Sequence, residues 1–451
     1  MKPSRRRLDG GDNPLEADWN VIGRIYVSPV GLTEGGVSLS DGWIVKVGRV
    51  SNLPRSSRVF KRRGTVILPG LIDCHVHLRG LNLSYKEDFY TGTCAAAAGG
   101  FATVLDMPNT DPPTDSPQRL RDKMREASRD VVVDVGFHVY PPKNAGELLE
   151  MHRMGAASVK FYMPMMELAR LEEMLPLCGS EGIPVTVHPE SRRVIEEASD
   201  RVGRLDSIED FLQVHSVRAE VEGVREVFKA GGKSVRIHLC HISSREALRV
   251  IEGARSKGVG CSVEATPHHL TLTFDDLFRI GSLGLTVPPL RSSHDLDALW
   301  SGLIGGEVDV IGSDHAPHSL DEKLSSDLGA VPPGIPGLET TLPLMTTFIS
   351  QGRLNIELLV RLLAENPSKI FGLKGKGYIK EGFRGDLTVI DLKLIHMVRP
   401  EAFKSKAKYS PFSGFKCRGR AVATFVGGSL AMEDGEILAE PGSGRVLING
   451  G

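Results

Sequence analysis

Two histidines, one residue apart, stand at the end of an apolar run, and an arginine follows them. Residues 68–74 form the run, and it leads into His75, His77 and Arg79. Side chains alternate faces along a strand, so these three would point the same way at its end. The imidazoles could form half of a metal site, and the guanidinium could bind a carboxylate through two hydrogen bonds. The alternative is a pair of histidines that only caps the strand.

Four more residues with side chains suited to metal binding lie in or after later apolar runs. Lys160 could snorkel, pair with a carboxylate, or be carbamylated to give a carboxylate that bridges two metals. His188 and His241 each end a run, and either alone is compatible with a structural histidine. Asp314 could bind a metal with one oxygen and move a proton with the other, or it could cap a helix. Such nitrogen and oxygen ligands suit two divalent ions, zinc best, although cobalt or manganese would also fit.

Three other histidines, His238, His268 and His269, could be either metal ligands or structural residues. His238 and His241 lie three residues apart, so they face opposite sides of a strand. We choose His241, because it is nearer the carboxyl end of the strand, where the sites of parallel barrels lie. His268 and His269 follow the next run, and we interpret them as loop histidines that order the rim.

Eight short apolar runs, separated by helix-like stretches, position these residues. Strands that alternate with helices imply parallel βαβ units, and eight units can close into a TIM (β/α)8 barrel. Residues 116–128 and 214–230 are the clearest predicted helices. The predicted strands are residues 66–73, 102–106, 131–139, 157–162, 183–187, 234–240, 259–263 and 308–312.

Both ends of the chain have a different pattern, with short alternating strands split by glycine-rich turns such as Glu433-Asp434-Gly435. Neither end has enough strands for a sheet of its own. We therefore predict one small β-sandwich domain formed from residues 1–68 and 376–451, around a barrel of residues 69–375. The first dozen residues are expected to be disordered or loosely tethered.

The composition favours a small-molecule partner. The 451 residues include 55 basic and 56 acidic ones, and the resulting net charge of −1 does not attract nucleic acid or an anionic membrane. No stretch approaches the roughly 20 apolar residues of a membrane span, and the basic start lacks the apolar segment of a signal peptide. Six scattered cysteines are expected to be reduced, which favours the cytoplasm.

The order of these residues resembles the metal-dependent amidohydrolase superfamily, and the similarity spans nearly the whole chain. Finer motifs make the chain similar to the dihydroorotases, in particular those with a carbamylated bridging lysine. The motifs are DCHVHLR at 73–79, DMPNT at 106–110, ATPHHL at 265–270, SDHAPH at 313–318 and PGIPGLET at 333–340.

The resemblance implies a role for each residue. His75, His77 and Asp314 would hold one zinc ion, His188 and His241 the other, with carbamylated Lys160 bridging both. Arg79, Asn109 and His318 would bind the substrate carboxylate, and the backbone near Gly334 would meet the ring. Asp314 would carry the proton during reversible closure of N-carbamoyl-L-aspartate to dihydroorotate in pyrimidine biosynthesis. Glu264 matches a position that contributes to an extra zinc in some relatives.

Three departures from the family pattern stand out. Arg79 is followed by Gly-Leu-Asn-Leu where relatives have Glu-Pro-Gly, and Val287 replaces an asparagine or arginine that touches substrate. The loop after Lys160, residues 163–166, lacks the polar residues that close over substrate in some relatives. Affinity or lid behaviour is therefore expected to differ.

Two other functions compete with this one. An allantoinase or hydantoinase shares the metal site but has no need of Arg79 to pair with a ring carboxylate. A non-catalytic scaffold would have lost ligands, whereas every expected ligand is present. Homodimerisation is expected only from the family, and association with another pyrimidine enzyme is left open.

Overall fold

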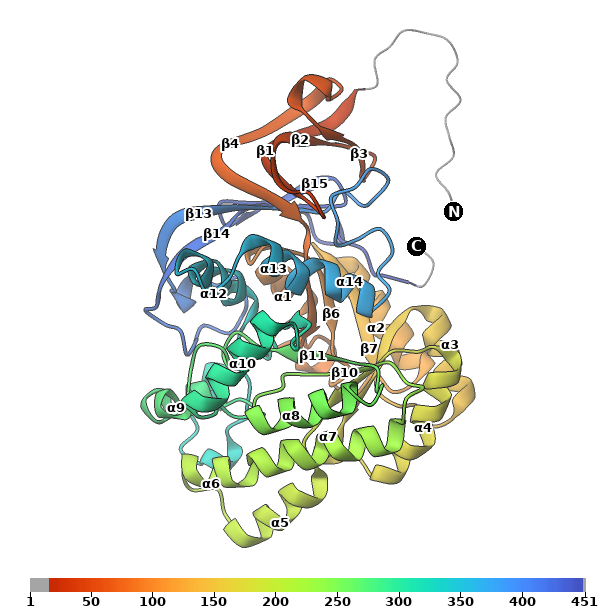
Figure 1. The fold of residues 1–451 in the computed structure, drawn as a ribbon, viewed down its shortest axis with the longest axis vertical. Coiled ribbons are helices and arrows are strands. Elements are labelled where there is room, and N and C mark those ends of the chain that lie inside the picture. The colour runs from red at the N-terminus through yellow and green to blue at the C-terminus, as the bar shows by residue number, and fades with distance from the viewer. Residues whose placement is uncertain (1–15, 449–451) are drawn as a thin grey trace.

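The computed structural model describes residues 16–448 and shows a barrel with a small β domain at one end (Figure 1). The prediction of disorder for the first dozen residues lies outside the described range. No helix among the described residues is long and apolar enough to cross a membrane.

Eight parallel strands form the barrel, and their carboxyl ends meet at one edge. The order follows the chain, so every strand pairs with its sequence neighbours. A bridge between Val76 and His315 closes the ring, and the His77 N–H donates to the His315 carbonyl at 2.7 Å. The strands are β5 (Leu71–Val76), β6 (Phe101–Asp106), β7 (Asp134–Val139), β8 (Ala156–Tyr162), β9 (Val185–His188), β10 (Ile237–Leu239), β11 (Cys261–Ala265) and β12 (Val310–Ile311).

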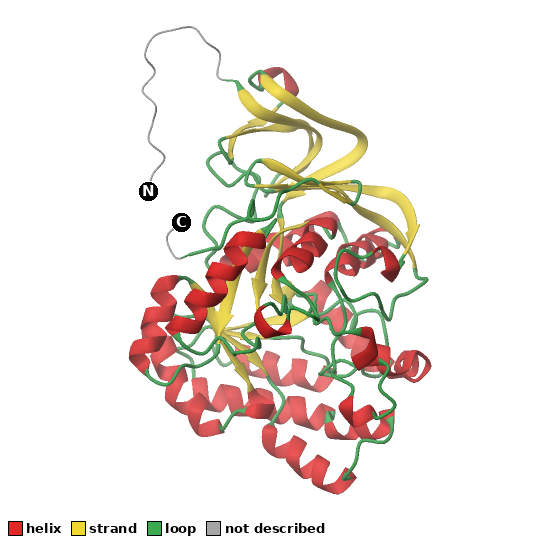
Figure 2. Ribbon diagram, turned by 180° about the vertical axis from the view of Figure 1, so that it is seen from behind, coloured by secondary structure: helices red, strands yellow, loops and turns green. Residues whose placement is uncertain are grey.

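Helices cover the outside of this sheet, as Figure 2 shows from behind. Most bury an apolar face against the strands, in the manner of a parallel barrel. They are α1 (Phe89–Ala98), α2 (Pro117–Asp130), α3 (Ala145–Met154), α4 (Leu168–Glu181), α5 (Arg192–Val202), α6 (Ile208–Val214), α7 (Val217–Gly231), α8 (Arg245–Arg255), α9 (Phe274–Ile280), α10 (Ser293–Gly305), α11 (Leu320–Lys323), α12 (Leu338–Ser350), α13 (Ile356–Val360) and α14 (Asn366–Ile370).

Local capping explains where the two predicted helices begin. Ser116 accepts a hydrogen bond from the Arg119 N–H, and Pro117 takes the first helical position, so α2 starts where predicted. The second helix begins later than predicted, at Val217. Residue 214 instead ends the separate helix α6, and His215 and Ser216 connect the two.

The small β domain joins the two ends of the chain in one hydrogen-bonded sheet of order β16-β15-β14-β13-β4-β1-β2-β3. Its amino-terminal half meets its carboxyl-terminal half where β4 pairs with β13. The pair β1 and β4 is parallel, and the other pairs are antiparallel. The strands are β1 (Ala17–Val27), β2 (Gly31–Ser40), β3 (Trp43–Gly48), β4 (Ser56–Pro69), β13 (Leu387–Met397), β14 (Lys416–Val426), β15 (Ser429–Glu433) and β16 (Glu436–Ile437).

Two-residue turns connect neighbouring strands of this sheet. The predicted turn at Asp434-Gly435 links β15 to β16, and Asp41-Gly42 links β2 to β3 in the same way. All four residues have positive φ, which matches the twist of a hairpin and favours the Asp-Gly pair. The expected barrel with a β domain drawn from both termini is confirmed.

The prediction of one continuous strand over residues 66–73 is wrong. The apolar run belongs to two sheets, because β4 ends at Pro69 in the small domain and β5 begins at Leu71 in the barrel. Gly70 lies between them, and its N–H donates to the Asp386 carbonyl. A Cβ atom at Gly70 would lie 2.6 Å from the Cβ of Asp386, so the crossing of the two domains requires glycine.

The last described residues return to the barrel. The Val135 N–H donates to the Arg445 carbonyl, and the Leu447 N–H donates to the Val135 carbonyl. This segment therefore runs beside β7.

Candidate metal and substrate site

All ten residues predicted from the sequence line one cavity of about 190 Å³ at the carboxyl ends of the barrel strands. They reach it from β5, β6, β8, β9, β10 and β12 or from the loops that follow. The ten are His75, His77, Arg79, Asn109, Lys160, His188, His241, Asp314, His318 and Gly334.

Three of these side chains converge on one point. Asp314 Oδ1 lies 3.3 Å from His75 Nε2 and 3.2 Å from His77 Nε2. His241 joins them, since ligand atoms of His75, His241 and Asp314 all lie within 4.8 Å of one another. The atoms of Asp314, His75 and His77 are spaced as donors to a single divalent ion, and His241 lies within reach of both this group and His188.

A second pair of nitrogens faces the same cavity. His188 Nδ1 lies 3.0 Å from His241 Nε2. The other nitrogen of His188 is bound to Glu190 at 2.8 Å, and Glu190 also contacts His215. A carboxylate on the far side of an imidazole fixes its ring and tautomer, as is usual for histidine ligands of metals.

The electrostatics favour the cation-binding forms of His77, His241 and Asp314. Burial lowers the pKa of His77 to about 4 and that of His241 well below its usual range, so both imidazoles are neutral near pH 7. Burial alone would raise the pKa of Asp314, but His75 and a hydrogen bond from His77 outweigh it and hold the pKa well below its usual range. Burial would lower the pKa of His75 as well, but Glu264 and Asp314 outweigh it and raise that pKa well above its usual range, so His75 would release a proton when it binds a metal.

Lys160 is the remaining candidate ligand. Its side chain comes from β8 into the cavity, and the residue is only 5% exposed. The Nζ atom contacts the Cys240 sulfur at 2.9 Å, and no ion pair among the described residues joins it to a carboxylate. A buried lysine without a carboxylate is costly as an ammonium ion, and carbamylation would remove that cost.

Arg79 has the burial and the free hydrogen-bonding capacity of an anion receptor. It is 6% exposed, and its Nε donates to the Pro317 carbonyl at 3.2 Å. Its Nη2 lies 3.1 Å from His318 Nε2, and Lys86 Nζ lies 3.1 Å from the other nitrogen of that ring. No described carboxylate pairs with Arg79, so a guanidinium charge faces the cavity uncompensated.

The comparisons with known proteins agree with this geometry. The sequence matches the amidohydrolase family over residues 66–431. The chain belongs to the amidohydrolase family. It is 39% identical to a dihydroorotase of Methanothermobacter thermautotrophicus, over 91% of this chain and 93% of that one. A dihydroorotase of Methanosarcina acetivorans is 33% identical over 95% of this chain and 94% of its own. Within the family, these relatives group the chain with the dihydroorotases.

Solved structures give the same fold. The L-hydantoinase (dihydropyrimidinase) of Arthrobacter aurescens superposes with a TM-score of 0.91 at 31% identity, over 96% of this chain and all of that one. A D-hydantoinase of a Thermus species superposes with a TM-score of 0.88 at 25% identity, over 95% of this chain and 98% of its own. The amidohydrolase family implies a binuclear metal centre, and the converging donors of this amidohydrolase fit one.

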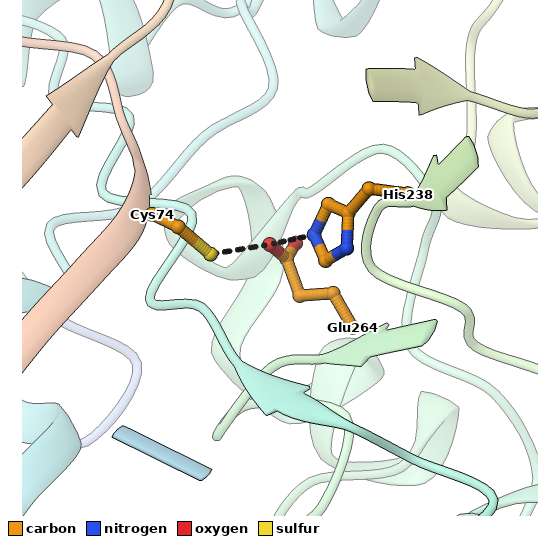
Figure 3. A group of neighbouring side chains, drawn as sticks. All are labelled: Cys74, His238 and Glu264. Atoms are coloured by element: carbon orange, nitrogen blue, oxygen red, sulfur yellow. Dashed lines mark hydrogen bonds and ion pairs between the residues drawn. The ribbon is translucent and has the colours of Figure 1, made fainter. Parts of the chain in front are cut away.

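Cys74, His238 and Glu264 form a buried cluster, drawn in Figure 3, and its carboxylate contacts the histidine ligands. Glu264 Oε1 lies 2.7 Å from His75 Nδ1 and accepts the His241 N–H at 3.0 Å. Its second oxygen lies 3.3 Å from His238 Nε2 and contacts the Cys74 sulfur. Burial would raise the pKa of Glu264, but His75 and His238 hold it well below its usual range. An ionised Glu264 therefore orients His75 so that its Nε2 faces the cavity.

The choice of His241 over His238 agrees with this arrangement. His238 Nδ1 is bound to Ser262 and its Nε2 to Glu264, and the residue does not line the cavity. His269 also behaves as a structural residue, since it contacts Thr266 at 2.7 Å and the Pro288 carbonyl at 3.2 Å.

The backbone is strained where the candidate residues enter the site. Arg79, His241 and Asp314 have φ values of 59, 33 and 47°, in the left-handed region that residues with a Cβ rarely occupy. Gly334 has φ of 142°, and a Cβ there would lie 2.4 Å from the Ala316 carbonyl oxygen. Such outliers gather at functional sites, where the surrounding structure compensates for their cost.

Sequence reasoning missed several residues of the site. Glu190 follows His188 by two positions, and that spacing could have indicated a partner for the imidazole. Tyr140 and Tyr162 line the cavity, and burial raises the pKa of the Tyr140 hydroxyl to about 12, so it remains a donor. Only the folded chain reveals that these hydroxyls lie beside the predicted ligands.

The departures from the family pattern also have a place in the structure. Val287 lines the cavity, where its side chain offers no polar atom. The loop after β8 presents Met165 to solvent, with 81% of the residue exposed. Gly80, directly after Arg79, has positive φ, and a Cβ there would lie 2.5 Å from the ring of Phe89.

Proposed function

We propose that this amidohydrolase is a dihydroorotase, a cyclic amide hydrolase that interconverts N-carbamoyl-L-aspartate and (S)-dihydroorotate in de novo pyrimidine synthesis. The observation that carries the proposal is Arg79, a buried guanidinium beside the candidate metal ligands without a carboxylate partner of its own. Dihydroorotate is a cyclic amide that bears such a carboxylate. The dihydroorotase relatives, matched over most of the chain, support the same substrate.

The cavity separates substrate binding from proton transfer. Arg79 would hold the substrate carboxylate in two hydrogen bonds, with His318 beside it. The Asn109 amide would add a donor, because its Oδ1 is already engaged by His77 and its NH2 group is left for the ligand. The backbone of Gly334 would lie against the ring.

Asp314 is the proton carrier of the proposed reaction. The carboxylate is ionised and lies at the metal-facing end of the cavity, so it would take a proton from water and give it to the ring nitrogen that leaves. In the biosynthetic direction the same group would remove a proton from the attacking nitrogen. When bound, the metals supply Lewis-acid polarisation of the amide carbonyl and activation of water.

The proposed cofactors are two zinc ions per chain. His75, His77 and Asp314 would hold one, His188 and His241 the other, and carbamylated Lys160 would bridge them. The nitrogen and oxygen donors, the neutral imidazoles of His77 and His241, and the unpaired lysine support this assignment.

The main alternative is a hydantoinase or an allantoinase, and the hydantoinase structures share the fold. A hydantoin carries no ring carboxylate, so it would leave the Arg79 charge buried and unpaired, at a cost of several kcal/mol. That cost argues against the alternative. A scaffold without catalysis is disfavoured because all the proposed ligands converge on one cavity.

Homodimerisation and association with another pyrimidine enzyme belong to this proposal as expectations from the family. We also propose a cytoplasmic location, because all six cysteines are free thiols and five of them are buried.

The deciding experiment is turnover by the zinc-loaded protein. Purified chain should interconvert carbamoyl aspartate and dihydroorotate between about pH 6 and 9, the range over which proton transfer at an activated water responds to pH. Metal analysis should find about two divalent ions per chain. Failure to convert either compound across that range would overturn the assignment.

A further inference from the structure

A buried lysine behind the cavity has no role in the proposed function. Lys323 ends the short helix α11, is fully buried, and forms no ion pair with any carboxylate of the described residues. Burial therefore lowers the pKa of its ammonium group to about 7. A lysine in such a place is costly, and methionine could fill the same volume without the charge.

The contacts of Lys323 join two separate loops. Its Nζ donates to the Leu285 carbonyl at 3.3 Å and to the Pro332 carbonyl at 3.1 Å. The two carbonyls belong to segments that enter the cavity as Val287 and as residues 332–334, which we call the two-loop wall. One ammonium group thus links both halves of the two-loop wall from behind.

Two further hydrogen bonds reinforce this link. The Gly334 N–H donates to the Leu285 carbonyl at 2.8 Å. The Tyr409 hydroxyl donates to the Gly334 carbonyl at 3.1 Å, and the Tyr409 ring lies 5.8 Å from Lys323 Nζ. The Leu285 carbonyl therefore accepts hydrogen bonds from both Lys323 and Gly334. The N–H and the carbonyl of Gly334 are both held by groups that lie behind the cavity.

The wall in turn touches the proposed carboxylate receptor. The Pro333 carbonyl lies 3.1 Å from His318 Nε2, and the same nitrogen lies 3.1 Å from Arg79. A shift of residues 332–334 would therefore move the ring that packs against Arg79.

We propose that Lys323, assisted by Tyr409, is a positioning residue that sets the geometry of the two-loop wall against the substrate. This inference rests on the proposed function for the identity of the substrate. Lys323 does not line the cavity, so it acts through the backbone of Leu285 and Pro332 and not by touching the ligand. The geometry also implies that Lys323 lowers the stability of the fold while it favours substrate binding. The buried charge is balanced only by two backbone carbonyls and the Tyr409 ring, and by no carboxylate among the described residues.

The test compares Lys323→Met with the wild type in steady-state kinetics and in thermal unfolding. The variant should raise KM for dihydroorotate about tenfold, which corresponds to the loss of about one charge-assisted hydrogen bond. Its kcat should change less than its KM, and its melting temperature should equal or exceed that of the wild type. Lys323→Gln, which retains an N–H donor, should recover part of the binding. Lys257→Met, at an exposed surface lysine, is the matched control and should leave both constants unchanged.

A second measurement does not depend on the substrate. Amide hydrogen exchange of residues 331–337 should be faster in Lys323→Met and in Tyr409→Phe than in the wild type, because both variants release the wall. Tyr409→Phe keeps the ring and removes only the hydroxyl, so it also serves if Lys323→Met fails to fold.

The two proposals fail in different ways. If the zinc-loaded wild type does not convert dihydroorotate, the proposed function is wrong, and the exchange experiment still decides the role of Lys323. If the wild type is active but Lys323→Met and Tyr409→Phe leave both KM and exchange unchanged, the positioning role is overturned.

Discussion

His77 Nδ1 lies 2.6 Å from Asn109 Oδ1, which joins a proposed metal ligand to a proposed substrate-binding residue. Through this contact Asn109 fixes the imidazole with its oxygen and keeps its NH2 group for the ligand. The proposed binding of metal and the proposed binding of substrate would therefore share the Asn109 side chain.

Two substitutions of Asn109 should separate these roles. Asn109→Asp keeps an oxygen for His77 but adds a charge that repels the substrate carboxylate, so metal content should persist while KM rises by at least about tenfold. Asn109→Ala removes both contacts and should also weaken metal binding, by about 10- to 100-fold. Metal titration beside steady-state kinetics checks both, and equal metal affinity in the two variants would contradict the shared role.

Arg79 should decide which cyclic amide is hydrolysed. Replacing it with alanine removes a bidentate, charge-assisted contact worth about 2–3 kcal/mol, so kcat/KM for dihydroorotate should fall about 30- to 150-fold or more. Any turnover of hydantoin should change little, because that ring carries no carboxylate. Measuring both substrates on the same preparation is the control. Equal losses on both would argue for a structural role of Arg79.

Removal of the proposed bridge should release the metals. Lys160→Ala should lower the metal content below about two ions per chain and abolish turnover, since Asp314 is the only carboxylate among the described residues that line the cavity, and it is already assigned to one of the two ions. Short carboxylic acids that diffuse into the space should restore part of the activity. Lys160→Met fills that space and should resist rescue. Metal analysis and a titration with acetate or propionate provide the readout.

Glu264 should matter more for metal affinity than for substrate affinity. Glu264→Gln keeps the shape but cannot balance the two imidazoles that contact it, so zinc affinity should fall about 10- to 100-fold, as for other partners of metal-bound histidines. KM at saturating zinc should stay near that of the wild type. A large change in KM with unchanged zinc affinity would show that Glu264 acts on substrate instead.

The sequence predicted the parts of the site that depend on strand parity and strand order. His75 and His77 enter the cavity at the end of β5, as the alternation of side chains predicts, and Asp314 joins them because eight parallel strands close a ring. Arg79 also enters the cavity, but it lies beyond β5 in a left-handed conformation that strand alternation does not predict. The contacts between distant residues could not be read in this way. Glu264 lies 189 positions from His75, and only the packed barrel brings the two side chains together.

The same limit explains the errors in the fold. The run of residues 66–73 looks like one strand because hydrophobicity alone cannot show that its halves enter different sheets. The contacts of Lys323 with the two-loop wall could not be predicted either. In the sequence, a single lysine in a polar stretch looks like a solvated surface residue, and only the fold shows that two loops cover it.

Stability should depend on pH through Glu339, a half-buried residue of α12. Burial raises its pKa from 4.5 to about 7, against hydrogen bonds from the backbone N–H groups of Lys404 and Ser405. Between those two pH values the folded chain holds a proton that the unfolded chain releases. The free energy of unfolding therefore falls as pH rises through this window, and the cost is fully present above about pH 7.

Glu339→Gln should remove this dependence, because glutamine keeps an oxygen for the two N–H groups and carries no charge. The variant should match the wild type near pH 4.5 and exceed it by roughly 1–3 kcal/mol above pH 7. Denaturant unfolding at several pH values measures the difference, with Glu401→Gln as the exposed control. A difference that stays constant with pH would mean that Glu339 is already ionised in the folded protein.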